Sequence, residues 1–332
     1  MPSIPPRTAF LSGATGFLGA NVVTSLTRDG WRVIALVRSS SKLDWLKQHA
    51  NVECVVGTIT DAASIAAAMP KHVDCVFHVA ATLVAWAPRH EEQWRTNVDG
   101  TQAMIDAALQ QNAKRFVHVS STAVYGNRHS IIDETTPRDG DKSAIHYFRS
   151  KHAAEERVRA AIATKGLPAV IIQPSAIIGP HDTTGFARLF VMIAQNNLAG
   201  IPPAANSFCY GPCVAEAVVA AATRGRVGEH YALPGADATY QEMIAEAAML
   251  LGKTETRQSV PLWVLKLIGR VKDVAAWFSG KEPDLSYENA LMVGSTTFVR
   301  SSKARDELGY QTMTMAEMLP PTIMWLKTNH YV

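Results

Sequence analysis

The stretch SGATGFLG, residues 12–19, follows a short apolar run and opens a segment with the apolar spacing of an amphipathic helix. Its glycines, Gly13, Gly16 and Gly19, are three residues apart. A strand that enters a helix through such a turn presents backbone N–H groups and the positive end of the helix dipole to a diphosphate. One glycine permits the tight turn, one lets the diphosphate approach, and one lets helix and strand pack closely. The stretch predicts a dinucleotide site, with a plain structural turn as the alternative.

The next expected strand, residues 32–37, ends beside a basic residue, Arg38. Enzymes that use NAD usually place an acid about twenty residues after the glycines, to bind the ribose 2′-hydroxyl. No acid occurs between Val37 and Leu43, and Arg38, Lys42 and three serines stand there instead. Positive charge and hydroxyls suit a 2′-phosphate, so NADP(H) is the predicted cofactor. A solvated basic loop is the alternative.

Composition indicates an ordinary globular protein. The chain has 332 residues, 47% of them hydrophobic, and a net charge of +3, so no strongly basic surface for nucleic acid is expected. Residues 1–6 contain no apolar signal core and no apolar run reaches the length of a membrane span, which predicts a cytoplasmic protein. The four cysteines match no zinc pattern, and no metal site is expected.

Short apolar runs alternate with helical patterns through the first half of the chain. Further strands are expected at residues 52–56, 74–79, 115–119 and 168–172. This alternation predicts an α/β fold, a doubly wound parallel sheet of the Rossmann type with helices on both faces. From residue 174 onward helical segments dominate. We expect a cofactor-binding domain over residues 1–173 and a smaller, mainly helical substrate lobe over 174–332, with residues 205–235 or so returning to the first domain.

Two side chains that can exchange a proton lie in the expected helix over residues 146–164. Tyr147 and Lys151 are four residues apart and therefore share a helix face. The lysine is expected to lower the pKa of the phenol, which could then give a proton to a carbonyl oxygen or take one from an alcohol. Ser121, just after a central strand, could donate a hydrogen bond to the same oxygen. The alternatives are an accidental surface pair and a serine that caps the next loop.

Together these motifs resemble the extended branch of the short-chain dehydrogenase/reductase superfamily, which has the fold of the NAD-dependent epimerases and dehydratases. The branch nearest to this chain contains dihydroflavonol reductases, 3β-hydroxysteroid dehydrogenases and related bacterial ketone or aldehyde reductases. The resemblance runs along nearly the whole chain, at residues 12–19, 77–81, 97–101, 120–126, 147–151, 173–175, 179–180, 302–305 and 307–310.

The resemblance implies a catalytic triad of Ser121, Tyr147 and Lys151, with Lys151 also holding the nicotinamide ribose. Asn97 is implied as a structural hydrogen-bonding residue, and His78 is expected to be packed and hydrogen-bonded rather than a base. The residues implied or predicted to bind the cofactor are Gly13, Thr15, Gly16, Phe17, Leu18, Gly19, Arg38, Lys42, Thr58, Ile59, Ala80, Ala81, Thr82, Ser120, Tyr147, Lys151, Pro174 and Ile177.

Three departures from the family pattern weaken assignments outside the triad. Thr58 stands where relatives usually place an aspartate that contacts adenine, and Gln173 replaces the usual arginine before Pro174. Residues 208–215 differ from the run that many relatives carry there, and Pro212 removes one backbone donor.

The predicted reaction is NADPH-dependent reduction of a ketone or aldehyde, reversible as alcohol dehydrogenation. Sugar 4,6-dehydratases of the family carry Asp-Glu after the serine position, where this chain has Thr122 and Ala123. Residues 206–210 contain no arginine for a nucleotide diphosphate, which favours an apolar substrate over a nucleotide sugar. An epimerase and a non-catalytic NADP-binding sensor remain the alternatives. The residues proposed to line the substrate pocket, which could equally be core residues, are Val84, Trp86, Ser121, Ile178, Phe186, Phe208 and Tyr210.

Residues 261–278 have apolar residues at helical spacing with basic residues between them. Packing over the substrate lobe or against another subunit is the favoured interpretation, and contact with a membrane surface is the alternative. The expected partner is a small carbonyl or alcohol substrate, without nucleic acid or a membrane span. The resemblance also implies a homodimer formed through the long helices before and within residues 147–164.

Overall fold

The computed structural model describes residues 6–39, 43–127, 130–198, 200–254 and 257–332. Its centre is a seven-stranded sheet in the order β10-β7-β5-β4-β1-β2-β3, in which every neighbouring pair is parallel. The strands span β1 Thr8–Ser12, β2 Arg32–Val37, β3 Val52–Val56, β4 Cys75–His78, β5 Phe116–Val119, β7 Ala169–Pro174 and β10 His230–Leu233. Strand order reverses on the two sides of β1, so the carboxyl ends of β1 and β4 border the crevice where such folds bind ligands.

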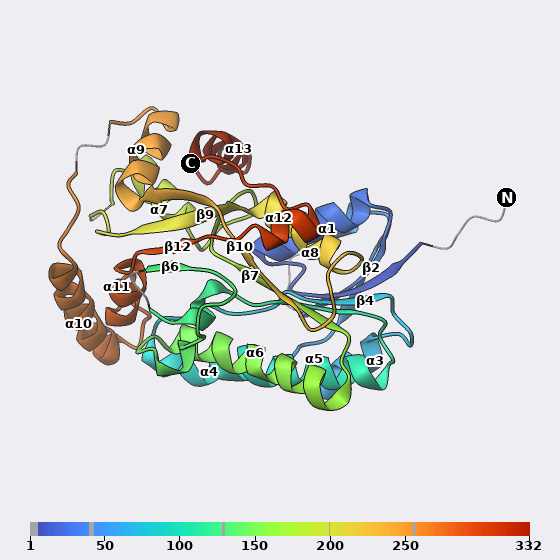
Figure 1. Ribbon diagram of the computed structural model, residues 1–332. Coiled ribbons are helices and arrows are strands. Elements are labelled where there is room, and N and C mark those ends of the chain that lie inside the picture. Colours follow the sequence, from blue (N-terminus) through green and yellow to red (C-terminus); the bar gives the residue numbers. More distant parts are fainter. Residues whose placement is uncertain (1–5, 40–42, 128–129, 199, 255–256) are drawn as a thin grey trace.

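Helices cover both faces of this sheet (Figure 1). Successive residues of a strand point to opposite faces, so Ala9 and Leu11 join one core and Phe10 joins the other. The first core is closed by α1 (Phe17–Arg28), α8 (Gly211–Ala221) and α12 (Lys303–Leu308). The second is closed by α3 (Ala62–Ala68), α5 (Gly100–Gln110) and α6 (His146–Lys165). Strands buried on both faces explain the continuous apolar runs, and the predicted fold class is confirmed.

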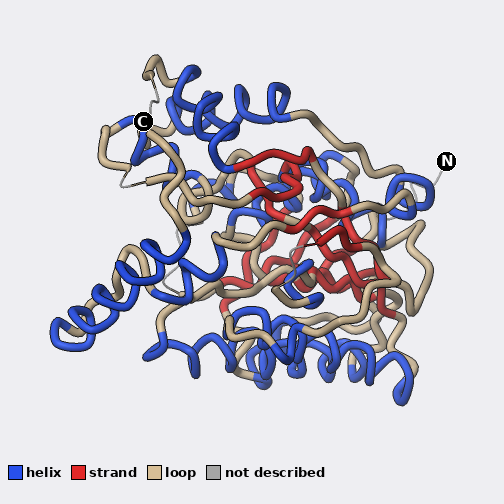
Figure 2. The backbone as a smooth tube through the Cα atoms, turned by 60° about the vertical axis from the view of Figure 1, so that its left-hand side comes forward, coloured by secondary structure: helices blue, strands red, loops and turns tan. Residues whose placement is uncertain are grey.

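A second, smaller sheet lies beside the first, and Figure 2 shows the strands in the middle of the molecule with helices around them. Its order is β11-β9-β12-β6, with β8 paired to β9. The strands span β6 Ser130–Ile132, β8 Ala176–Ile178, β9 Ala205–Tyr210, β11 Ala236–Thr239 and β12 Thr297–Val299. Strands β8, β9 and β11 enclose a third apolar core with α7 (Ala187–Ala194), α9 (Tyr240–Leu250) and α13 (Met315–Thr328).

The prediction of a mainly helical second half missed this sheet. Two of its strands, β6 and β12, have three residues each, and they pair Thr297 with Ser130 across a large separation in sequence. A local pattern carries no signal for such a pairing.

The remaining helices are α2 (Asp44–Lys47), α4 (His90–Trp94), α10 (Leu262–Ser279) and α11 (Tyr287–Val293). Helices α10 and α11 form an edge of the molecule, at the left of Figure 1. Among the helices of the described ranges, none has the length and apolar character needed to cross a membrane.

Candidate active site

The β1–α1 turn uses its three glycines differently. Gly13 has a φ of +83°, and a Cβ there would lie 2.7 Å from the backbone N of Ala80. A Cβ on Gly19 would lie 1.8 Å from the carbonyl O of Gly13, so this glycine lets α1 pack on the turn. A Cβ on Gly16 would meet only that carbonyl O, at 3.4 Å. The fold therefore requires glycine at 13 and 19 but not at 16.

The open space at Gly16 fits a dinucleotide diphosphate. Gly16 is the N-cap of α1 and has no side chain to cap the helix, so the first-turn N–H groups are left for another acceptor. They lie at the carboxyl end of β1, at the point where strand order reverses. Neutral N–H donors at the positive end of a helix suit an anionic diphosphate.

Other predicted cofactor residues lie after the neighbouring strands. Arg38 directly follows β2 and is exposed to solvent, while Lys42 lies outside the described residues. Thr58 is in the turn after β3, where its backbone N donates to Ser64 Oγ at 3.1 Å and its hydroxyl lies 3.1 Å from that of Thr60. Hydrogen bonds of serine and threonine hydroxyls within the turn therefore stabilise the turn after β3.

The structure brings Ser121, Tyr147 and Lys151 together. Ser121 follows β5. Its hydroxyl accepts from the backbone N of Ala123 at 3.1 Å, the capping bond expected as the alternative, and it also lies near enough to the phenol of Tyr147, in the first turn of α6, to lower that phenol's pKa. Lys151 is 2% exposed, and its Nζ donates to the carbonyl O of Val119, the last residue of β5, at 2.9 Å. A hydroxyl, a phenol and a buried ammonium therefore lie at the carboxyl edge of the central sheet.

The pKa values of this group differ from the expectation that Lys151 lowers the pKa of Tyr147. Burial raises the pKa of Tyr147, and the nearby hydroxyl of Ser121 opposes that rise. Burial lowers the pKa of Lys151 to about 8, while the carboxylate of Glu155 opposes the decrease. Burial outweighs the opposing effect of Ser121, so the expected decrease in the pKa of Tyr147 is wrong.

Sequence reasoning missed a buried carboxylate behind Lys151. Glu155, one helical turn further along α6, accepts hydrogen bonds from Ser120 Oγ at 2.6 Å and from Gln173 Nε2 at 2.8 Å. Arg159 also donates to it, at 2.7 Å. The hydroxyl of Ser120 is thus committed to Glu155. The unusual Gln173 was the one signal in the sequence, because an amide can donate to this carboxylate in place of an arginine.

The loop after β4, which contains Ala80, Ala81 and Thr82, is fastened to α6 by Asn97. Asn97 lies in a turn of π-helix, Arg95–Asp99. Its Oδ1 accepts from the N of Thr82 at 2.8 Å, and its Nδ2 donates to Ser150 Oγ at 3.0 Å. The structural role expected for Asn97 is confirmed by these bonds.

His78, at the end of β4, is buried, and both of its ring nitrogens have partners. Nδ1 lies 2.8 Å from Ser12 Oγ and Nε2 lies 2.9 Å from Thr101 Oγ1. Burial, with the Lys151 charge as a smaller cause, lowers the pKa of His78 to about 3. The expectation of a packed, hydrogen-bonded residue is confirmed.

Two further residues missed from the sequence hold the start of α6. Gln93 donates to the carbonyl O of Val84 at 2.9 Å, and its Oε1 lies 2.7 Å from Nδ1 of His146. Glu288 of α11 accepts from the backbone N of His146 and lies 2.7 Å from Nε2 of His90. These bonds act on the residue that precedes Tyr147.

The residues expected to line a substrate pocket have different environments. Val84, Ile178 and Phe208 are buried, the last two in the third apolar core, so in this structure they offer no surface to a ligand. Partly exposed side chains are those of Trp86, Phe186, Tyr210 and, among the cofactor candidates, Ile177, whereas Pro174 is buried. Leu83, in the loop after β4, was not predicted to line the pocket. Its side chain is 58% exposed.

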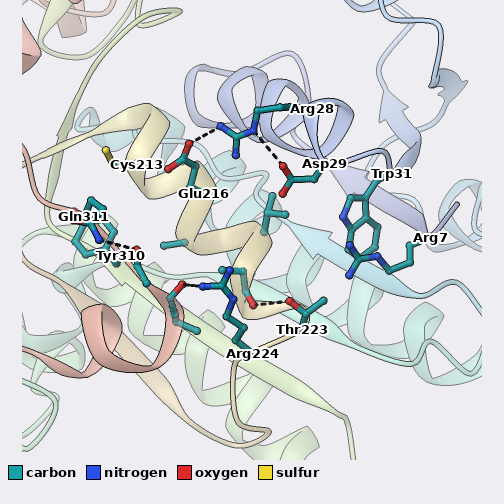
Figure 3. A pocket seen from close by; sticks show the side chains of 15 residues that line it. Arg7, Arg28, Asp29, Trp31, Cys213, Glu216, Thr223, Arg224, Tyr310 and Gln311 are labelled. Atoms are coloured by element: carbon teal, nitrogen blue, oxygen red, sulfur yellow. Dashed lines mark hydrogen bonds and ion pairs between the residues drawn. The ribbon is translucent and has the colours of Figure 1, made fainter.

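A separate polar pocket of about 290 Å³ lies between α1, α8 and the chain after α12 (Figure 3). Arg28 pairs there with Glu216 at 2.6 Å, and Arg7 stacks on the ring of Trp31. Of the described residues that line this pocket, none belongs to the predicted site.

Comparison with known proteins places this chain in a family. The sequence profile of the NAD-dependent epimerase/dehydratase family matches residues 9–233. The chain belongs to this family. It is therefore an enzyme of the oxidoreductase or epimerase type that uses a nicotinamide dinucleotide, and the resemblance inferred from the motifs is confirmed.

Individual relatives cover nearly the whole chain. A Synechocystis sp. protein with the provisional name dihydroflavonol 4-reductase is 28% identical over 331 residues, which are 97% of this chain and 95% of that protein. A 4-hydroxy-2-methyl-3-oxo-4-farnesyl-3,4-dihydroquinoline-1-oxide ketoreductase of Stigmatella aurantiaca is 28% identical and covers 91% of each chain. The crystal structure of gox2253 is 30% identical, with a TM-score of 0.83 over 98% of this chain and 99% of that one.

Proposed function

We propose that this protein is an NADPH-dependent reductase of ketones or aldehydes with an apolar body, reversible as an alcohol dehydrogenase. The observation that carries the proposal is that the Ser121 hydroxyl, the buried phenol of Tyr147 and the buried ammonium of Lys151 meet at the end of β5. A bound nicotinamide dinucleotide supplies or accepts the hydride. Ser121 donates a hydrogen bond to the substrate oxygen as negative charge develops on it. Tyr147 gives that oxygen a proton in reduction and takes one from it in oxidation.

The residues that would hold the cofactor come from the carboxyl edge of the sheet. The α1 N-terminus at Gly16 would bind the diphosphate, and Lys151 would bind the nicotinamide ribose. Arg38, exposed at the end of β2, supports NADP(H) because a guanidinium pairs well with a 2′-phosphate. We further propose that residues 1–173, with 205–235, bind the cofactor and that the rest of 174–332 binds the substrate. The pairing of β10 with β7 supports that division.

Reduction is favoured over epimerisation or dehydration by the residues around the triad. Thr122 and Ala123 follow Ser121, where a dehydratase would need acid and base groups. The exposed side chain of Leu83 and the partly exposed Trp86 support an apolar substrate. The ketoreductase relative is consistent with this reaction type.

A substrate panel tests the proposal. Aromatic and alicyclic ketones and aldehydes are supplied with NADPH or NADH, and nucleotide sugars are supplied in parallel, with absorbance at the reduced-nicotinamide band and product chromatography as readouts. We expect consumption of NADPH with the ketones. Conversion of a nucleotide sugar without net change of cofactor, or tight NADP binding with no turnover of any compound, would overturn it.

The cofactor preference is tested at Arg38. Replacing Arg38 with Asp removes the 2′-phosphate contact and adds a repulsive charge, so the ratio of kcat/KM for NADPH to that for NADH should fall by about 10- to 100-fold. Arg32→Gln is the matched control, because Arg32 begins the same strand and its exposed partner is Glu53. An unaltered preference in Arg38→Asp would count against NADP.

A further inference from the structure

Helix α10 (Leu262–Ser279) presents an apolar face to solvent. Its buried residues are Leu265, Gly269 and Ala276. On the other side of the helix, six large apolar side chains are between 55% and 79% exposed, and we call them the α10 ridge: Trp263, Leu267, Val271, Val274, Trp277 and Phe278. Monomeric soluble proteins rarely expose so many large apolar side chains together, and such a patch marks an interaction site.

The spacing of the ridge follows from helix geometry. Steps of four, four, three and four residues lead from Trp263 to Phe278 and keep the side chains on one face. The opposite face is fixed to α11, because a Cβ on Gly269 would lie 2.7 Å from the carbonyl O of Ser286. This close backbone contact leaves the ridge on the solvent side of the helix. Helix α10 itself lies at the edge of the molecule (Figure 1).

Positive charge borders the ridge. Lys266 and Arg270 lie along one of its edges, and Lys281 follows the helix. Among the described residues, none of these three cations has an ion-pair partner, and Arg270 lies 4.6 Å above the ring of Tyr287. The ridge therefore combines an apolar surface with unpaired cations.

The nearby carboxylates are already engaged elsewhere. Asp273 accepts from the backbone N of Tyr287 at 2.9 Å, and Asp284 pairs with Lys272 at 2.7 Å. Glu282 pairs with Arg89 at 2.7 Å. A second copy of this face would bring the same cations without free carboxylates to meet them, whereas an anionic lipid surface supplies the complementary charge.

We propose that the α10 ridge binds the interfacial region of a membrane that contains anionic lipids. Tryptophan and phenylalanine side chains partition into the boundary between headgroups and acyl chains, while lysine and arginine bind the phosphates. The ridge covers 16 residues, or about 24 Å of helix. Helix α10 packs on α11, whose Glu288 accepts from the backbone N of His146 at the start of α6.

Vesicle binding by the full-length protein tests this inference without any activity measurement. The probes are vesicles of phosphatidylcholine alone, or mixed with phosphatidylglycerol, separated by flotation. We expect binding to the anionic vesicles that weakens as salt screens the charges. Brominated lipid should quench tryptophan emission, and a Trp263→Phe/Trp277→Phe double variant should lose most of that quenching while it still binds.

Two variants and one control separate the apolar and the charged contributions. Trp277→Glu combined with Phe278→Glu should reduce vesicle affinity at least about tenfold. Lys266→Gln combined with Arg270→Gln should reduce affinity for anionic vesicles by roughly thirtyfold. Met249→Glu, at a 69% exposed position of α9, should bind like the wild type. Circular dichroism and urea unfolding would test whether each variant is folded.

Three results would overturn the inference. The first is no flotation of the wild-type protein with anionic vesicles at low salt. The second is an equal loss of binding in Met249→Glu, which would show a general surface effect. The third is a dimer in analytical ultracentrifugation that Trp277→Glu/Phe278→Glu dissociates, because the ridge would then be a subunit interface.

Discussion

At the scale of single residues, Lys151 is a buried ammonium that destabilises the fold and that we propose to be catalytic. A buried ammonium with one carbonyl partner and a pKa of about 8 is disfavoured in its charged form by the fold. The decrease from 10.5 corresponds to roughly 3 kcal/mol against folding when the amine is charged. A cation kept at this cost is typical of a functional site, where stability is exchanged for activity.

Lys151→Met is therefore expected to stabilise the cofactor-free protein while it abolishes turnover. Removing the charge removes the roughly 3 kcal/mol by which it disfavours folding. The carbonyl of Val119 then loses its donor, which costs about 1 kcal/mol, so the free energy of unfolding should increase by roughly 2 kcal/mol at pH 7. Between pH 8 and 10.5 the unfolded wild-type chain binds more protons at this lysine than the folded chain does, so wild-type stability rises with pH there. The stability advantage of Lys151→Met over the wild type is therefore largest below pH 8 and declines between pH 8 and pH 10.5.

Urea unfolding of both proteins at pH 7 and pH 10 measures this difference. A Lys151→Met variant that is less stable than the wild type at pH 7 would contradict the assignment of a costly buried charge. A difference that stays constant with pH would contradict the depressed pKa.

Tyr147→Phe separates the proton-transfer role from binding. The ring and its packing remain, but the proton donor is lost, so kcat should fall by about a thousandfold or more. The dissociation constant for NADPH, measured by fluorescence titration, should change by less than about threefold, because the phenol acts on the substrate oxygen. Retained turnover would refute the proton role, and a large loss of NADPH affinity would show that the phenol acts mainly by holding the cofactor.

At the scale of elements, the β1–α1 turn separates the needs of the fold from those of the cofactor. Gly19→Ala places a methyl group on the backbone of Gly13 and should destabilise the protein by about 3 kcal/mol or more. Gly16→Ala meets no backbone clash and should change stability by less than about 1 kcal/mol. It should nevertheless weaken NADPH binding at least about tenfold, because the methyl group occupies the space proposed for the diphosphate.

Thermal unfolding without cofactor and titration with NADPH read out the two effects. An unchanged NADPH affinity in Gly16→Ala would contradict the proposal that this helix terminus binds the diphosphate. A stable Gly19→Ala protein would contradict the packing argument instead.

The strands and helices differ in how well the sequence alone predicts them. Strands β2 and β3 were predicted with their observed bounds. For β2 the reason is that a buried parallel strand is a continuous apolar run with local signals at both ends, whereas β3 is a partly exposed edge strand that contains Glu53. Strands β6 and β12 were missed because their partners are distant in the chain. For α10 the periodicity was visible, but spacing alone cannot tell which apolar face is covered.

Within the candidate site, the pairing of Tyr147 with Lys151 on one helix face could be predicted, whereas the residues that support this helix could not. Tyr147 and Lys151 are related by a helical spacing, which is local information. Glu155, Gln93 and Glu288 act through contacts with other elements, and nothing in their neighbouring sequence shows those contacts.

At the scale of the whole molecule, two carboxylates connect the α10–α11 edge to the part of the protein that carries the site. Glu288 is largely buried and bonds both to His90 and to the backbone N of His146. Glu282 pairs with Arg89, and both of these side chains are 40% exposed. The two positions form a matched pair, because both join this edge to the segment around α4 and differ chiefly in burial.

Glu288→Ala should therefore act on both stability and catalysis. The loss of a partly buried acceptor with two donors should cost roughly 2–3 kcal/mol in urea unfolding, whereas Glu282→Ala removes an exposed pair and should cost less than about 1 kcal/mol. Because His146 precedes Tyr147, Glu288→Ala should also lower kcat by about tenfold through a misplaced phenol, with NADPH affinity nearly unchanged. Equal effects of the two variants, or an unaltered kcat in Glu288→Ala, would show that the edge does not position the catalytic helix.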